Sequence, residues 1–149
     1  YSCFQFEITE TVATEYSASL TRVAESFQAA GIGLCLDDFG SGYANLNTVM
    51  QLPFSAIKLD RSLLNKICED PRSANFYHSI VSSFQNMGFH VISEGVETAD
   101  EVKLLSDYGV DMIQGFYFSK PLPSEKLLDL LEKSYSSKER HHICHYCLH

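Results

Sequence analysis

The stretch Ile32-Gly33-Leu34-Cys35-Leu36-Asp37-Asp38-Phe39-Gly40-Ser41-Gly42-Tyr43 decides how this chain folds. Its first five residues form an apolar run with the length of a buried strand, and two carboxylates and a glycine-rich turn follow at once. Four further segments with this character are predicted as strands, at 4–8, 56–59, 89–93 and 112–118. We therefore expect five short strands, several of them followed directly by charged residues.

Helix-type segments separate these strands. The segment 17–30 carries apolar residues at the spacing of one helix face, at Leu20, Val23, Ala24 and Phe27. Further helices are predicted over 41–52, 71–87, 98–108 and 125–135. The helix over 98–108 begins with a capping-box spacing, Thr98 and Glu101. Strands that alternate with helices predict βαβ units and a parallel sheet.

The positions of the carboxylates choose between the two architectures that this alternation allows, a doubly wound sheet and a (β/α)8 barrel. Acidic residues recur where the predicted strands end, at Glu7, Asp37, Asp38 and Glu94. In a barrel these ends converge on one face, which is the usual active-site face. A doubly wound sheet typically carries a glycine-rich phosphate loop, and no such motif is present in the sequence. We therefore predict an α/β fold, a partial TIM-like (β/α)8 barrel of about five strand–helix units.

The composition is that of a globular protein, with 45% hydrophobic and 20% charged residues among 149. The formal net charge of −8 gives no electrostatic footprint for a nucleic acid polymer or an anionic membrane. No apolar run has the length of a membrane span, and residues 1–4 lack the basic region of a signal peptide. Five cysteines without a secretory signal indicate a reducing compartment. We expect a cytoplasmic location, with a membrane anchor before residue 1 of a longer protein left open.

Carboxylates gathered at one barrel mouth repel one another and need compensating charge. Divalent cations with oxygen ligands are the usual compensation, and Asp37 and Asp38 together can bridge two of them. Both side chains face one site if the strand ends at Asp37 and the turn over 39–42 begins at once. Lys58 can hold a metal-bound water or a phosphoryl oxygen electrostatically. Each feature alone also fits a simpler role, because strand-end Asp residues often cap helices and a strand-end Lys is often solvated.

Five segments, in order along the chain, resemble the successive motifs of EAL domains. They are Phe6-Glu7-Ile8-Thr9-Glu10, Asp37-Asp38-Phe39-Gly40-Ser41-Gly42-Tyr43, Ile57-Lys58-Leu59-Asp60, Glu94-Gly95-Val96-Glu97, and Gln114-Gly115 followed by Pro121. The resemblance extends over residues 3–132 and implies a modified (β/α)8 barrel. It also implies an enzyme, a bacterial phosphodiesterase that hydrolyses cyclic di-GMP to linear pGpG by two-metal catalysis with Mg²⁺ or Mn²⁺.

The resemblance implies a chemical role for each residue at the strand ends. Glu7, Asp37, Asp38 and Glu94 correspond to metal ligands, with Asp37 as the bridge between two ions. Lys58 corresponds to the lysine that holds the nucleophilic water. Glu94 also corresponds to a glutamate proposed as general base, so Lys58 and Glu94 are the expected catalytic residues.

The resemblance also implies roles around this centre and a departure from the family pattern. Glu97, Gln114 and Pro121 are expected to line the substrate site, and Glu10 is expected to anchor the loop after Asp38. Two expected ligands of the first ion, the glutamate of the namesake Glu-Ala-Leu motif and an asparagine, have no counterpart in the sequence. We therefore expect the chain to be part of a longer barrel and to be inactive by itself.

The resemblance leaves an alternative function open, a non-catalytic EAL domain that acts as a cyclic di-GMP receptor or protein-interaction module. Such domains typically lose ligands such as the Asp pair or the motif over 94–97, and both are intact here. The catalytic reading is therefore favoured. An open set of five strands would expose sheet edges, so we expect a homodimer or other self-association. GGDEF or sensor domains are expected companions in a longer protein.

The last residues differ in character from the rest of the chain. We assign residues 1–135 to the EAL domain and residues 136–149 to a polar tail rich in Cys and His. The tail contains a C-x-x-C pair, Cys144 and Cys147, which can bind zinc. Structural zinc sites normally draw ligands from two separated pairs, so a flexible tail is expected.

Overall fold

The computed structural model describes residues 5–14, 18–42, 46–67 and 70–136. The strands are β1 (Gln5–Thr9), β2 (Gly33–Phe39), β3 (Ala56–Leu59), β4 (His90–Ser93) and β5 (Met112–Ile113). The helices are α1 (Glu10–Thr14), α2 (Ala18–Ala29), α3 (Leu46–Gln51), α4 (Arg61–Ile67), α5 (Pro71–Asn86), α6 (Ala99–Asp107) and α7 (Ser124–Ser136).

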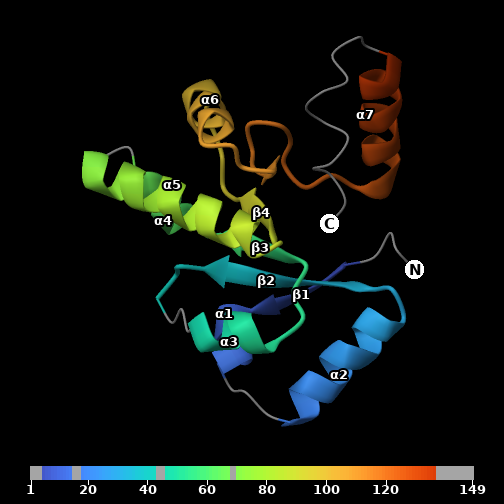
Figure 1. The fold of residues 1–149 in the computed structure, drawn as a ribbon. Helices are drawn as coiled ribbons and strands as arrows, with labels where there is room; N and C mark the ends of the chain where they lie inside the picture. The colour runs from blue at the N-terminus through green and yellow to red at the C-terminus, as the bar shows by residue number, and fades with distance from the viewer. Residues whose placement is uncertain (1–4, 15–17, 43–45, 68–69, 137–149) are drawn as a thin grey trace.

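All five strands lie in one parallel sheet, in the order β1-β2-β3-β4-β5. A doubly wound sheet reverses its strand order at a switch point, whereas here each strand pairs with the next strand along the chain. This singly wound order is that of a (β/α)8 barrel. The α/β class and the barrel-type arrangement predicted from the sequence are therefore confirmed. Figure 1 shows α4 and α5 side by side; α5 packs against β4, and α2 packs against β2.

The two faces of the sheet have different surroundings, because successive side chains along a strand point to opposite faces. One face packs against the helices and contributes Leu34, Leu36, Ile57, Leu59 and Val91 to the main apolar core. The other face carries a smaller cluster of Cys35, Ala56 and Ile92, with Met112 of β5 packed against it. In the barrel arrangement this second face is the inner one. The residues two positions further along each strand therefore continue the inner face towards the carboxyl ends.

Two short helices were not predicted from the sequence. α1 has five residues and α4 has seven, so neither is long enough to show the apolar repeat of a helix. Longer helices were predicted well, and the expected capping box at Thr98 and Glu101 is present at the start of α6. Of the helix predicted over 41–52, the structure shows Leu46–Gln51 as α3 and no helix at residues 41 and 42, and residues 43–45 lie outside the described residues.

The strand predicted over 112–118 is wrong beyond its first two residues, because β5 consists only of Met112 and Ile113. The chain turns at Gly115, which packs directly on the backbone of Val96. Val96 N donates to Gln114 O at 3.1 Å, and Tyr117 N donates to Val96 O at 2.9 Å. These bonds join the loop after β5 to the loop after β4, and they take the place of further strand pairing.

Some predictions fall on residues that the structure does not describe. These are the start of the first strand at position 4, the start of the helix at position 17, and the Cys/His-rich tail beyond α7. The division of the chain at residue 135 therefore stays a prediction. Among the described residues, no helix is long and apolar enough to cross a membrane.

Candidate active site

The inner face of the sheet ends in charged side chains from four neighbouring strands. Strand pairing places Glu7 of β1 beside Cys35 of β2, and Lys58 of β3 beside Ile92 of β4. Asp37 follows Cys35 by two residues and Glu94 follows Ile92 by two residues, so both continue the inner face of the sheet. Parallel strands run in one direction, so these side chains all lie at the carboxyl edge of the sheet. The convergence of strand ends that was predicted from the sequence is therefore present.

A bulge in β2 brings Asp37 and Asp38 to the same site. Leu36 pairs with Ile57 and Phe39 with Leu59, so that two residues of β2 lie opposite the single residue Lys58. Asp38 takes a φ of 60°, a left-handed conformation that Asp tolerates better than most residues. The condition considered from the sequence, a strand that ends at Asp37, is not met, since β2 continues to Phe39. Neighbouring side chains of a regular strand point to opposite faces, and the bulge allows both Asp37 and Asp38 to point to one site.

Lys58 is the centre of an ion-pair network. Its Nζ lies 2.8 Å from Glu7 Oε1, 3.0 Å from Asp37 Oδ1 and 2.7 Å from Glu94 Oε1. Only 4% of the Lys58 side chain is exposed, so the site is shielded from bulk water on this side. Burial opposes the charged ammonium, but hydrogen bonds to Glu7, Glu94 and Asp37 outweigh it and raise the pKa of Lys58 above its usual value. Lys58 is therefore charged at neutral pH.

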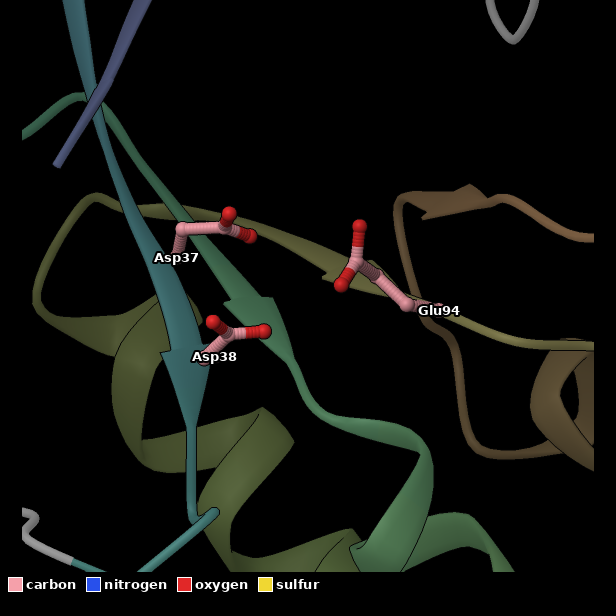
Figure 2. A group of neighbouring side chains, drawn as sticks. All are labelled: Asp37, Asp38 and Glu94. Atoms are coloured by element: carbon pink, nitrogen blue, oxygen red, sulfur yellow. The ribbon is translucent and has the colours of Figure 1, made fainter. Parts of the chain in front are cut away.

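Asp37, Asp38 and Glu94 form a group of three carboxylates that point towards one another from the ends of β2 and β4 (Figure 2). One oxygen from each lies within 4.8 Å of the other two. Burial raises the pKa of Glu94, against the opposing effect of Lys58. Burial and the neighbouring charges of Asp37 and Asp60 raise the pKa of Asp38. A divalent cation with oxygen ligands would fit this donor set and relieve its repulsion.

The remaining predicted site residues lie on several separate segments of the chain. Glu10 is buried at the start of α1, and Ser41 Oγ, in the loop after Asp38, donates to its Oε2 at 3.4 Å. Gln114 follows β5 and is half-buried, with its backbone N–H donating to Ser93 O at 2.8 Å. Pro121 is exposed in the segment before α7, and Glu97 is exposed in the segment before α6.

Arg61 is a residue of this region that the sequence reading missed. It begins α4 and forms an ion pair with Glu97, and its Nη1 donates to the carbonyl oxygen of Gly95 at 2.6 Å. This pairing lowers the pKa of Glu97. The sequence feature that could have indicated a role for Arg61 is its position directly after the Lys58-x-Asp60 segment. Asp60 itself lies beyond β3, and its Oδ1 accepts from Ser62 N at 2.9 Å, as a helix cap does.

Comparison with known proteins identifies the family and the fold of the chain. The family model described as the EAL domain matches residues 2–121. The chain belongs to the EAL domain family. The cyclic di-GMP phosphodiesterase RocR of Pseudomonas aeruginosa is 38% identical over 128 residues, which cover 86% of this chain and 33% of RocR. The cyclic di-GMP phosphodiesterase PdeR of Escherichia coli is 36% identical over 124 residues, which cover 83% of this chain and 19% of PdeR.

Solved EAL structures are similar to most of the chain. The PaMucR phosphodiesterase in complex with c-di-GMP has a TM-score of 0.76 and 32% identity, over 85% of this chain and 51% of that one. The EAL enzyme Bd1971, with cAMP and cyclic di-GMP bound, has a TM-score of 0.79 and 33% identity, over 85% of this chain and 34% of that one. This EAL chain spans a third or less of the length of RocR and PdeR.

Proposed function

We propose that this EAL chain forms part of the active site of a cyclic di-GMP phosphodiesterase that hydrolyses its substrate to linear pGpG. The observation that carries the proposal is the network in which buried Lys58 contacts carboxylates from three other strands. RocR and PdeR, both named as cyclic di-GMP phosphodiesterases, are the relatives that support this substrate. The activity belongs to the whole protein, of which this chain supplies the strand ends described above.

The donor set of Asp37, Asp38 and Glu94 supports a metal-dependent reaction with Mg²⁺ or Mn²⁺. Both ions prefer oxygen ligands, and carboxylates that approach within 4.8 Å of one another suit a divalent charge. We assign Glu7, Asp37, Asp38 and Glu94 as the ligands. Bound ions would supply Lewis-acid activation of the phosphodiester and would neutralise its negative charge. They would also explain how a chain of net charge −8 binds an anionic dinucleotide.

The protein side chains hold and orient the reacting groups. In this proposal Lys58 Nζ, which stays charged, fixes Glu7, Asp37 and Glu94 in place and stabilises negative charge on the attacking water or the phosphoryl oxygen. Glu94 is a candidate general base, since burial raises its pKa. Glu10 holds the loop after Asp38 through Ser41. Gln114 and Pro121 are proposed to line the substrate site, with Glu97 held beside it by Arg61.

The test is hydrolysis of cyclic di-GMP, followed as pGpG by chromatography, for the protein that contains this chain with Mg²⁺ or Mn²⁺ present. We expect Asp37→Asn and Lys58→Met each to lower kcat by at least about 100-fold, because each removes charge from the reaction centre. Asp129→Asn is the matched control, since this exposed carboxylate of α7 lies outside the site, and it should leave kcat unchanged. Full activity in the Asp37→Asn variant would refute the assignment.

Two further experimental outcomes would distinguish an enzyme from a receptor and test whether the separate chain is active. Tight binding of cyclic di-GMP without any pGpG would support the receptor alternative instead of the enzyme. We also propose that the separate 149-residue chain is inactive, because its sequence contains no counterpart of the metal-binding glutamate of the Glu-Ala-Leu motif. Mn²⁺-dependent turnover by that purified chain would contradict this second proposal.

We also propose self-association and a cytoplasmic location. β1 pairs with β2 along one edge, and among the described residues no strand pairs with its other edge. Unpaired strand edges favour pairing with a second copy. A substrate of this class, a nucleotide second messenger, supports a cytoplasmic site of action. GGDEF or sensor domains remain proposed companions in the longer protein.

A further inference from the structure

A buried hydrogen bond links α5 to the end of β4, directly before Glu94. Tyr77 hydroxyl donates to Ser93 Oγ at 2.8 Å, and both side chains are almost completely buried, at 2% and 0% exposed. Burial raises the pKa of Tyr77 to about 12, so its hydroxyl keeps its proton at neutral pH. The two residues are sixteen positions apart in the chain and lie on different elements.

The surroundings of this pair are otherwise apolar. Ser93 lies on the helix-facing side of β4, the side that carries Val91, and Tyr77 lies in α5 with Val81 and Phe84 in the main core. A buried hydroxyl without a partner costs about 1–3 kcal/mol, whereas a pair of apolar groups in the same place costs little. The hydrogen bond therefore contributes little to the net stability of the fold, and its main effect is to fix the position of β4 along the axis of α5.

Ser93 is also the last residue of β4, so its position sets that of Glu94. Its carbonyl oxygen accepts from Gln114 N at 2.8 Å, and Glu94 N donates to Leu59 O at 3.1 Å. On the other side of Glu94, Arg61 holds the carbonyl oxygen of Gly95. Glu94 reaches Lys58 at 2.7 Å, a contact that a shift of about 1 Å would break.

We propose that Tyr77 and Ser93 are positioning residues for Glu94, which fix the end of β4 so that the Glu94 carboxylate meets Lys58, Asp37 and Asp38. This inference rests on the proposed function in one respect, since it takes Glu94 as a metal ligand. The two hydroxyl groups touch neither substrate nor metal and act only through the backbone of β4.

The test uses three variants of the 149-residue chain: Tyr77→Phe, Ser93→Ala and the double variant. Each single change leaves one buried hydroxyl without its partner and should lower the melting temperature. The double change removes both hydroxyls, so its melting temperature should return towards that of the wild type. Mn²⁺ binding, measured by electron paramagnetic resonance, should be weakened about tenfold in all three, the order found for groups that orient metal ligands.

A positioning role and a merely structural role differ in the double variant. If the pair only stabilises the fold, Mn²⁺ affinity will recover together with the melting temperature, and the proposal is overturned. If the pair positions Glu94, affinity stays low although stability returns. Tyr108→Phe is the matched control, because its ring lies 6.3 Å from that of Tyr77 and the change removes a hydroxyl without touching Ser93. It should leave Mn²⁺ affinity unchanged.

A second readout does not depend on metal. Amide hydrogen exchange at Glu94 should become about tenfold faster in the double variant than in the wild type, while exchange at Leu36 in β2 stays the same. Unchanged exchange at Glu94 would overturn the proposal even if the single variants fail to fold. If the wild-type chain binds no Mn²⁺, or if Asp37→Asn binds it equally well, the proposed metal site is refuted. The exchange experiment still tests the positioning role in that case.

Discussion

At the scale of single residues, one ammonium group organises four strands. Lys58 is buried to 4% exposure of its side chain and still contacts Glu7, Asp37 and Glu94. A buried charge is tolerated only when it is paired, and here each partner comes from a different strand. The same lysine therefore limits the repulsion among the carboxylates in the absence of a cation. Asp38 is not one of the three carboxylates that contact Lys58, so its negative charge is less well compensated than theirs.

The charge of Asp38 should destabilise the metal-free protein in a pH-dependent way. Burial, Asp37 and Asp60 raise its pKa above the ordinary value of 3.8, so the folded state binds this proton more tightly than the unfolded chain does. The cost of ionisation is absent below pH 3.8 and is complete once the pH passes the raised pKa. Asp38→Asn should therefore be more stable than the wild type at pH 7 in EDTA, by less than about 1 kcal/mol for a partly exposed group.

Urea unfolding of both proteins between pH 3.5 and 7 measures this difference, which should shrink as the pH falls. Asn also tolerates the left-handed conformation at φ 60°, so this change isolates the charge. Asp38→Ala is the comparison for the backbone, and it should be roughly 1–2 kcal/mol less stable than Asp38→Asn at every pH, because both variants lack the charge. A stability difference between wild type and Asp38→Asn that stays constant with pH would contradict the electrostatic explanation.

At the scale of elements, the site depends on how the loops after β4 and β5 meet. Gly115 packs on the backbone of Val96, and a Cβ at this position would overlap the carbonyl oxygen and amide nitrogen of Val96. The two hydrogen bonds of Val96 to the segment after β5 require this close approach. The loop that carries Glu94 and Glu97 is therefore fixed by a glycine on the next strand connection.

Gly115→Ala should destabilise the fold by about 3 kcal/mol or more, because backbone atoms must separate to admit the methyl group. Gly109→Ala is the matched control. Gly109 has a φ of 72° and no atom within 4 Å of an added Cβ, so only the conformational cost of roughly 1–2 kcal/mol applies. Thermal and urea unfolding measure both variants. Equal losses of stability would show that the close approach to Val96 is unimportant.

At the scale of the whole molecule, we propose that the open edge of β1 controls association of the chain. If copies of the 149-residue chain pair through this edge, light scattering during size-exclusion chromatography will give a mass above that of one chain at micromolar concentrations. A charged lysine on an edge strand opposes such pairing. Gln5→Lys, at an exposed position of β1, should therefore shift the protein towards the monomer.

Gln28→Lys is the control for this experiment, because it makes the same charge change at an exposed position of α2. It should leave the association of the chain unchanged. A protein that is monomeric at all concentrations, or two variants that behave alike, would refute association through β1.

The sequence by itself determined the strand–helix alternation, the strand 56–59 and the placement of acidic residues at strand ends, because these are local patterns of apolar spacing and turn residues. It also identified the EAL motifs. Only the tertiary structure decided the rest. The bulge that turns Asp37 and Asp38 to one site depends on pairing with β3, and the Tyr77–Ser93 bond depends on how α5 packs on β4. Such contacts join residues far apart in the chain, and no local pattern encodes them.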